Sequence, residues 1–360
     1  MAAVRSLLLQ GTPIIWLLLI LRMPSSSSLQ GKRSNGRCIE SEMDALLSFK
    51  AGLSDPWGQL SSWQGEDCCL WKGVHCSNKT GYVVKLDLHG DCVSENFLGG
   101  EISSPLARLH HLNYLDLSCN NFSKASIPNF FDSLKNLRYL NLSCSVSGGR
   151  LPPQLGNLSK LIYLYLNWGY CYSYVYSDSL TWVSRLSSLK YLDMSWVNLS
   201  AAVDWIHAVS SLPSLQVLHL AGSGLRNMGV SLGHSNLTTL KLLDIKYNSF
   251  HTEISPNWFW HITTLTYLDL SSSNFHGQIP YEIGNMTSLE EVYIGDNNIT
   301  SMIPPNLKNL CNLNILEVQL NNITGDIGDL MERLPKCSWN KLYRLDVSYN
   351  KRRRWRGIAT

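Results

Sequence analysis

The sequence predicts an α/β solenoid, a superhelix of stacked coils that share one parallel β-sheet on the concave side. Two observations predict this fold. The phrase from Leu265 to Ser288 begins again at Leu289, 24 residues on. An LxL core, with leucine or a similar residue, recurs eleven times along the chain. One coil of this size cannot bury its own apolar side, so it needs a copy above and a copy below.

The spacing of the repeats indicates their type. The first core residue stands at Leu86, Leu115, Leu140, Leu164, Leu192, Leu218, Leu243, Leu268, Val292, Leu316 and Leu345. Successive positions lie 24 to 29 residues apart, as in leucine-rich repeats. A GxIP phrase follows the strand, most clearly at Gly277, Ile279 and Pro280, and it indicates the plant-specific subtype. We expect the repeat array over residues 81–350.

A helical, disulfide-bonded N-terminal cap is expected over residues 29–80. Ser41, with Asp44 three residues later, predicts a helix N-cap, and apolar residues follow at helical spacing. A helix over residues 42–51 would cover the open end of the first coil, which a solenoid cap must do.

The first 28 residues are expected to be a secretory signal peptide. Arg5 precedes an apolar run from Ser6 to Leu21, and small residues follow in MPSSSS. A membrane anchor is the alternative, but the run is short and contains Pro13. No second apolar stretch of 18 residues exists, so no membrane span is expected in the mature chain.

The last ten residues differ from the rest in charge. The net charge is +3, and removing the five positive charges of KRRRWRGIAT leaves −2 for residues 1–350. No basic face for nucleic acid is therefore expected outside this tail. Arg352 occupies a slot that needs an apolar core residue, and an unpaired Arg is costly to bury. Residues 351–360 are interpreted as a basic anion-binding patch, or as the mark of a premature stop or mis-splicing.

Ten cysteines and nine N-x-S/T sequons agree with secretion. The sequon asparagines are Asn78, Asn121, Asn141, Asn157, Asn198, Asn236, Asn285, Asn298 and Asn322. Asn141 lies within a predicted strand, so poor glycosylation is expected there.

Two pairs of cysteines are favoured by their places in the repeat. Cys119 and Cys144 occupy the same slot of neighbouring coils, about 5 Å apart, which favours a disulfide between them. Cys311 and Cys337 lie on the back of adjacent coils and also form a candidate pair. Partners for the two other cysteines of the strand–turn region, Cys92 and Cys171, are left open.

Five coils carry Asn five residues past the aligned core residue. These positions are Asn120, Asn248, Asn297, Asn321 and Asn350. Each side-chain amide is expected to bond backbone groups of its own and the next coil, where the turn leaves them unpaired.

The sequence contains no motif of an enzyme. We find no HExxH, GxSxG, phosphate-loop or kinase signature, and the ten histidines lack metal-ligand spacing. Neither catalysis nor a cofactor or metal is expected.

The residues that flank each core leucine point away from the core and are the candidates for binding. They predict a tyrosine column beside an acidic column, with two tryptophans at the rim. The candidate ligand-binding residues are Tyr114, Asp116, Tyr139, Tyr163, Tyr165, Trp168, Tyr191, Asp193, Trp196, His219, Asp244, Tyr267, Asp269 and Tyr293. Tyr and Trp are frequent recognition anchors. Tyr also suits strands, and Asp suits a strand end in many such repeats, so each single residue has an equally good structural explanation.

The block from Cys38 to Cys76 resembles the N-terminal cap of plant extracellular leucine-rich repeat proteins. The match is carried by Cys38, Ala45-Leu46-Leu47, Phe49-Lys50, Asp55-Pro56, Leu60-Ser61-Ser62-Trp63, Cys68-Cys69, Trp71, Gly73-Val74 and Cys76. The resemblance implies two disulfides, Cys38–Cys68 and Cys69–Cys76. A metal site is the rival interpretation, which an oxidising compartment disfavours.

Two lengthened coils, between Leu164 and Leu218, narrow the resemblance. They are similar to a subfamily of plant receptor-like proteins that includes receptors for fungal ethylene-inducing xylanase and the apple scab resistance homologues. The match is carried by Ser179-Leu180-Thr181-Trp182, Leu186-Ser187-Ser188-Leu189-Lys190-Tyr191-Leu192-Asp193, Val197-Asn198-Leu199-Ser200, Asp204-Trp205, Leu310-Cys311-Asn312-Leu313, Asn321-Asn322-Ile323 and Cys337.

The resemblance implies a truncated ectodomain of a receptor-like protein in plant defence. Such a protein would bind an extracellular protein, peptide or glycan and signal through co-receptor kinases. Full-length members of the family are single-pass proteins of the plasma membrane, whereas this chain as written would be secreted. The alternatives are a secreted inhibitor of a microbial cell-wall-degrading enzyme, which would lack the Trp-bearing insertion, and a non-functional truncated product.

Overall fold

The computed structural model describes residues 37–351, apart from residues 95, 123–125, 147, 170, 172–173 and 229–236. The expected signal peptide, the sequon residue Asn236 and the tail from Arg352 onward lie outside the described residues. Within the described ranges, no helix is both long enough and apolar enough to cross a bilayer.

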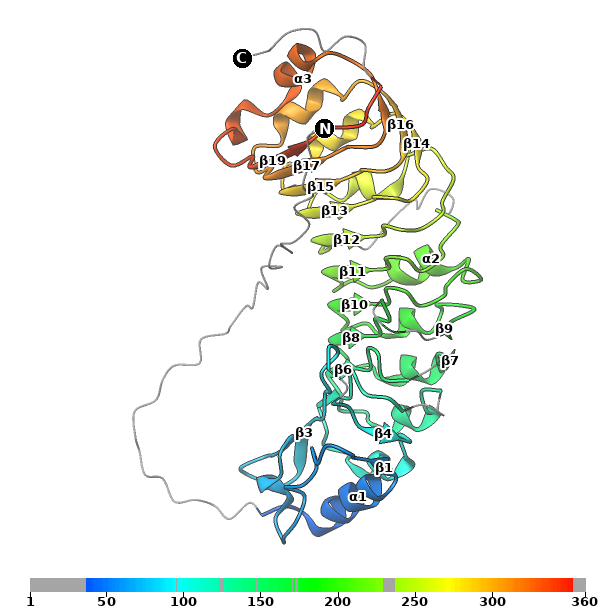
Figure 1. The fold of residues 1–360 in the computed structure, drawn as a ribbon, viewed down its shortest axis with the longest axis vertical. Helices are drawn as coiled ribbons and strands as arrows, with labels where there is room; N and C mark the ends of the chain where they lie inside the picture. Colours follow the sequence, from blue (N-terminus) through cyan, green and yellow to red (C-terminus); the bar gives the residue numbers. More distant parts are fainter. Residues whose placement is uncertain are drawn as a thin grey trace, which may run out of the picture. The chain divides into compact units, whose positions relative to one another are not determined.

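One twelve-stranded sheet runs through the stack of coils (Figure 1). Its strands are β2 (Val74–Cys76), β3 (Val83–Asp87), β5 (Tyr114–Asp116), β6 (Tyr139–Asn141), β8 (Tyr163–Tyr165), β10 (Tyr191–Asp193), β11 (Val217–His219), β12 (Leu242–Asp244), β13 (Tyr267–Asp269), β15 (Glu291–Tyr293), β17 (Ile315–Glu317) and β19 (Arg344–Asp346). From β3 to β19 the strands pair in parallel and in chain order. The predicted core residues pair with one another across every step, as Leu86 does with Leu115. The predicted solenoid is therefore confirmed.

The twelfth strand was not predicted from the sequence. β2 belongs to the cap and pairs antiparallel with β3, so that Val74 lies opposite Leu86. It covers the first edge of the sheet, and an edge covered in this way is protected from pairing with another chain.

The opposite side of each coil is built from short helical turns and extended segments (Figure 1). The α-helices are α1 (Glu40–Ala51), α2 (Trp205–Ser210) and α3 (Ile327–Arg333). The 3-10 helices span Cys68–Leu70, Ser104–Arg108, Asn129–Ser133, Pro153–Asn157, Val183–Arg185, Trp258–His261, Tyr281–Asn285, Pro305–Asn309 and Lys336–Ser338. Three small sheets join β1 (Leu53–Ser54) to β4 (Gly99–Gly100), β7 (Gly148–Arg150) to β9 (Tyr174–Tyr176), and β14 (His276–Gly277) through β16 (Asn298–Ser301) to β18 (Asn322–Ile323). Several of these extended strands carry the Gly of the GxIP phrase.

The cap helix begins earlier than the sequence predicts. Its N-cap is Ile39, which makes no side-chain hydrogen bond, so Ser41 is not the N-cap. The preceding Cys38 is fixed by a disulfide and by a hydrogen bond from its backbone N–H to Asp67, 3.1 Å long, and the helix starts directly from this anchor. Glu42, in the first turn, accepts a hydrogen bond of 2.6 Å from the backbone N–H of Val83 and joins the helix to β3. Burial raises the pKa of Glu42 above its ordinary value, although this hydrogen bond lowers it in part.

All ten cysteines are paired, and one predicted pair is wrong. The disulfides are Cys38–Cys68, Cys69–Cys76, Cys92–Cys119, Cys144–Cys171 and Cys311–Cys337. The two cap disulfides are those that the family resemblance implied, and Cys311–Cys337 was a candidate.

The favoured bond between Cys119 and Cys144 does not form. Both residues have positive φ, 54° and 52°, in equivalent turns, so their side chains point in the same direction and not toward each other. A disulfide requires the two Cβ atoms to face each other at about 4 Å. Each cysteine is instead bonded by one from an adjoining coil, Cys92 or Cys171, at Cα–Cα distances of 4.9 and 5.7 Å.

The asparagine ladder forms. Each amide bonds backbone groups of its own coil, as predicted, but its other partners lie in the preceding coil and not in the next. The Oδ1 of Asn248 accepts from Leu225 N at 2.9 Å, and its Nδ2 donates to Leu220 O at 2.9 Å, both one coil earlier. Equivalent bonds are made by Asn120, Asn297, Asn321 and Asn350. The amide lies on the side of its coil that faces the previous turn, where the unpaired backbone groups are.

Candidate ligand-binding face

Five tyrosines lie side by side on the outer face of strands β5 to β10. We call Tyr114, Tyr139, Tyr163, Tyr165 and Tyr191 the tyrosine platform. Their order follows from the parallel register, in which Tyr114, Tyr139, Tyr163 and Tyr191 are successive partners and Tyr165 lies at the next outward position of β8. Four of these residues are the part of the predicted tyrosine column that the structure brings together, and Tyr165 joins them from the neighbouring outward column.

The rings of the platform touch one another. Tyr114 and Tyr139 are stacked with centroids 4.1 Å apart, and Tyr165 lies 5.3 Å from Tyr139 and 4.4 Å from Tyr191. Tyr163 is 41% exposed, while the other four are half-buried. Large rings with two side-chain torsions lose little entropy when a ligand packs on them, which makes such a surface suitable for recognition.

A second, smaller aromatic cluster lies farther along the sheet. Tyr267 and Tyr293 have ring centroids 5.4 Å apart, and their hydroxyls donate to Asp269 and Glu291 at 3.3 and 2.8 Å. These bonds occupy the polar ends of both rings. The strands between, β11 and β12, carry Val217 and Leu242 at the tyrosine position, so the predicted column is interrupted.

The predicted acidic column is not an exposed binding surface. Asp116, Asp193, Asp244 and Asp269 are all buried. In each, Oδ1 accepts the backbone N–H two residues on, at 2.9 to 3.3 Å. Asp at a strand end commonly makes this turn-closing bond. These carboxylates therefore shape the turns and are not exposed, and their contact with a ligand stays a prediction.

The two rim tryptophans have different environments. Trp168 is only 2% exposed and belongs to the core, so its prediction as a rim residue is wrong. Trp168 lies in a lengthened coil, four residues past the aligned leucine. In the neighbouring coils the residue at this position has positive φ, but Trp168 does not, so its turn departs from the repeat geometry. Trp196 is 48% exposed with φ of 64°, and its ring lies 6.1 Å from that of Tyr247.

Tyr247 was missed by the sequence reasoning, although a signal exists. It follows the aligned leucine of β12 by four residues, as Trp196 follows that of β10, and it also has positive φ. The coil between them has Gly222 at this slot, where a Cβ would lie 2.7 Å from the Trp196 ring. The glycine therefore makes room for the indole to lie across its coil.

Basic side chains neutralise the carboxylates at both ends of the face. Lys85 Nζ lies 3.0 Å from Asp87 Oδ2 and 4.1 Å from the centroid of the Tyr114 ring. Farther along, Lys246 Nζ lies 3.4 Å from Asp244 and 3.0 Å from Asp269. At the last strand, Arg344 pairs with Glu317 at 2.6 Å.

The carboxylates beneath the tyrosine platform have neutral partners. Asp116 accepts from the Tyr139 hydroxyl at 3.2 Å and from Asn141 Nδ2 at 3.1 Å. Asp193 accepts from Asn167 Nδ2 at 3.0 Å. No ion pair to Asp116 or Asp193 is found within the described part of the chain.

Electrostatics at the face follow from this arrangement. Burial first, and then the negative charges of Asp87 and Asp116, raise the pKa of Tyr114 to about 12. Burial likewise raises the pKa of Tyr165 to about 12, with contributions from Tyr163, Asp193, Tyr114 and Asp116. The hydroxyls of Tyr114 and Tyr165 are therefore un-ionised at physiological pH, and both lie in a field of negative sign.

His219 continues the face beside the platform. Its ring lies 5.8 Å from that of Tyr191, and its Nδ1 lies 3.3 Å from Asp244 Oδ2. Burial alone would raise the pKa of Asp244, but the hydrogen bond with His219 and the charge of Lys246 hold it below its ordinary value.

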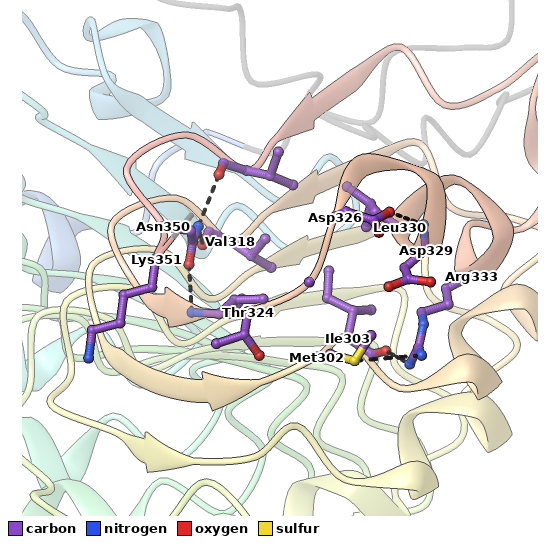
Figure 2. Close-up of a pocket in the computed structure, with 13 residues that line it drawn as sticks. Met302, Ile303, Val318, Thr324, Asp326, Asp329, Leu330, Arg333, Asn350 and Lys351 are labelled. Atoms are coloured by element: carbon purple, nitrogen blue, oxygen red, sulfur yellow. Dashed lines mark hydrogen bonds between the residues drawn. The ribbon is translucent and has the colours of Figure 1, made fainter. Parts of the chain in front are cut away.

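A pocket lies at the other end of the array, between α3 and the last coils. Met302, Ile303, Val318, Ile323, Leu330 and Val347 form its apolar wall. Figure 2 shows Arg333 reaching Ile303, where its Nη1 donates to the backbone oxygen at 2.6 Å, and Asn350 bridging to Val318. Both polar groups hold neighbouring coils together, so the pocket has a structural explanation.

The structure contains one group of potential metal-binding atoms in the described ranges, the sulfurs of Cys38, Cys68 and Cys69. All three are oxidised in disulfides. Because only the thiolate binds a metal, this group is not a metal site.

Family models match several parts of the chain. The leucine rich repeat N-terminal domain matches residues 39–77, and leucine rich repeat models match residues 108–125, 213–275 and 288–310. The sequence is 35% identical over 264 residues to "Receptor-like protein EIX1" and 36% identical over 311 residues to "Receptor-like protein EIX2", both of Solanum lycopersicum. The chain is a leucine-rich repeat protein related to the plant receptor-like proteins.

The alignments cover 69% and 77% of this leucine-rich repeat chain, but only 25% and 30% of these two relatives. Among solved structures, the Arabidopsis receptor kinase HAESA, in complex with the peptide hormone IDA and the co-receptor SERK1, is similar at a TM-score of 0.67 and 26% identity. That match covers 87% of this chain and 54% of HAESA.

Proposed function

We propose that this chain is the ligand-recognition part of an extracellular receptor-like protein in plant defence. The tyrosine platform binds an extracellular protein, peptide or glycan, and signalling passes through partner receptor kinases. The observation that carries the proposal is the contiguity of five rings on one outward face, supported from below by buried carboxylates. Tyrosines placed for strand stability alone have no need to form one continuous surface that faces away from the core.

The comparisons support this proposal in two ways. The curated relatives are receptor-like proteins, and the structural neighbour HAESA was solved with a peptide hormone and a co-receptor. Because the chain spans about a quarter to a third of these relatives, plasma-membrane attachment and kinase partnership are proposals about the longer protein.

The test compares two exposed tyrosines on opposite sides of the coils. Tyr163 lies on the platform, whereas Tyr281 opens a 3-10 helix on the back and is 65% exposed. The purified full chain and its Tyr163→Ala and Tyr281→Ala variants are titrated by biolayer interferometry against defined probes. The probes are a fungal xylanase, a polygalacturonase, short extended peptides, a chitin hexamer and an oligogalacturonide.

We expect at least one probe to lose tenfold or more in affinity for Tyr163→Ala and to keep its affinity for Tyr281→Ala. Loss of one buried aromatic anchor commonly costs about 2 kcal/mol or more of binding energy, which is more than tenfold in affinity. The proposal is contradicted if no probe binds the parent chain, or if every probe that binds it has the same affinity for both variants. Inhibition of the polygalacturonase or xylanase by the chain alone would favour a secreted inhibitor instead.

A further inference from the structure

The charge pattern along the strand face is uneven, and the unevenness coincides with the tyrosine platform. Lys85 is paired with Asp87 on one side of the platform. On the other side Lys246 is paired with both Asp244 and Asp269. Between these basic residues the platform has the charges of two buried aspartates, and every hydrogen bond found to them within the described residues comes from a neutral donor.

The field of both aspartates reaches the hydroxyl of Tyr165 in the middle of the platform. Asp116 and Asp193 lie on β5 and β10, and Tyr165 lies between them on β8. Both carboxylates contribute to the raised pKa of the Tyr165 hydroxyl. The ring faces carry their own negative quadrupole, so rings and carboxylates act in the same direction on a cation.

The protein already shows this chemistry at the first ring of the platform. Lys85 Nζ lies over the Tyr114 ring at 4.1 Å from the centroid while it pairs with Asp87 at 3.0 Å. The arrangement combines a ring face with a carboxylate, and the cation comes from the chain itself. At Tyr165 and Tyr191 the ring faces and the carboxylate of Asp193 are present, and within the described residues no Lys or Arg lies over either ring. His219, whose ring lies 5.8 Å from that of Tyr191, is paired with Asp244.

We propose that the tyrosine platform recognises an arginine side chain of an extended peptide, with the guanidinium stacked on Tyr165 and Tyr191 beside the buried carboxylate of Asp193, the register partner of Tyr165. This inference rests on the proposed function and names the chemistry of its ligand. A planar guanidinium is weakly hydrated and stacks on aromatic rings, so it suits a site whose carboxylates are covered. Ammonium groups are more strongly hydrated and lose more on contact with such a surface.

The size of the platform agrees with a short extended peptide. Strands β5 to β10 are three steps of the sheet, about 14 Å at ~4.8 Å per step. An extended chain advances about 3.3 Å per residue, so about four residues would cross the platform. A glycan would use the same rings through its apolar faces but would gain nothing from the two aspartates.

The test uses two matched probes, an acetylated and amidated Gly-Arg-Gly-Arg-Gly peptide and the same peptide with citrulline in place of arginine. Citrulline has nearly the shape of arginine without its charge. Affinities for the purified full chain are measured by calorimetry at low and at physiological salt. We expect the arginine peptide to bind at least fivefold more tightly than the citrulline peptide, and its advantage to shrink as salt increases.

Two carboxylate variants locate the effect. Asp193→Asn keeps an oxygen for the N–H of Ser195 and removes the charge beneath the platform, so the preference for arginine should fall at least threefold. Glu317→Gln removes a charge that Arg344 already neutralises, and the preference should stay unchanged. Thermal unfolding of each variant confirms that it is folded.

Equal binding of the two peptides, or no binding of either, overturns the inference, as does an equal effect of the two carboxylate variants. A neutral peptide or a glycan that depends on Tyr163 but not on Asp193 also overturns it. That last result leaves the proposed function standing, because the function fails only when no probe distinguishes Tyr163→Ala from Tyr281→Ala.

Discussion

The asparagine ladder makes a quantitative prediction for the stability of the array, and Asn248 is its best example. The side chain is buried and makes four hydrogen bonds to backbone groups. Two of them reach the preceding coil, at the N–H of Leu225 and the C=O of Leu220, and both of those residues are buried. Asn248→Ala leaves both groups without this partner.

The expected cost follows from those two groups. A buried donor or acceptor left unpaired costs about 1–3 kcal/mol. Because two such groups lose this partner, we expect the free energy of unfolding to fall by about 3 kcal/mol in all. Asn248→Ser should fall between the parent and the alanine variant. Serine occupies this slot in three other coils, and in two of them the hydroxyls of Ser223 and Ser273 each donate to the preceding coil at 3.0 Å.

The assay is chemical denaturation followed by fluorescence and circular dichroism, together with hydrogen exchange at the amide of Leu225. Exchange is included because repeat arrays can unfold one part at a time, so a single global transition is not assumed. Asn312→Ala is the matched control. It removes an exposed asparagine whose Nδ2 bonds Thr287 O at 3.1 Å, and it should change stability by less than about 0.5 kcal/mol. Asn248→Ala with an equally small effect and unchanged exchange at Leu225 would refute the role of the ladder.

Three further predictions concern other parts of the face and its surroundings. Burial, and then the charge of Asp116, raises the pKa of Tyr139, so this tyrosine ionises first in the unfolded chain and the free energy of unfolding falls as pH rises above about 10. Urea titrations across that pH range should show a shallower fall of this free energy for Tyr139→Phe. The same pH dependence in the parent and in the variant would contradict the pKa shift. Asn141 Nδ2 is occupied by Asp116, whereas Asn285 is exposed on the back of its coil. When the chain is expressed through a plant secretory pathway, glycopeptide mass spectrometry should find the sequon at Asn285 modified and the sequon at Asn141 unmodified. The reverse would contradict this. Gly222→Ala places a methyl group 2.7 Å from the indole of Trp196, on a residue whose φ is 62°. The substitution should lower the free energy of unfolding by about 1–3 kcal/mol, measured by thermal unfolding. An unchanged melting temperature would be inconsistent with that contact.

The fold was predictable because one physical requirement recurs in every coil. Each coil must bury its leucine against the next, so the sequence spacing of Leu115, Leu140 and Leu164 already determines which strands are neighbours and in which register. The tyrosine positions follow from the same register, because side chains alternate between the two faces of a strand.

The remaining features depend on local geometry that spacing does not encode. The partner of Cys119 was missed because side-chain direction, and not the distance between slots, decides which thiols meet. The burial of Asp116 was missed because neighbouring rings cover it and its turn uses one of its oxygens. Trp168 was misplaced because a lengthened coil changes the turn that presents it.

The central claim, that ligands are recognised on the tyrosine platform, is tested most directly by photo-cross-linking from two positions. Benzoylphenylalanine is introduced in place of Tyr163 or of Tyr281, and each protein is irradiated with the tightest-binding probe of the panel. We predict that the probe becomes covalently attached from position 163 and not from position 281. Attachment from position 281 alone, or from neither position although the probe is bound, would show that recognition takes place on another surface.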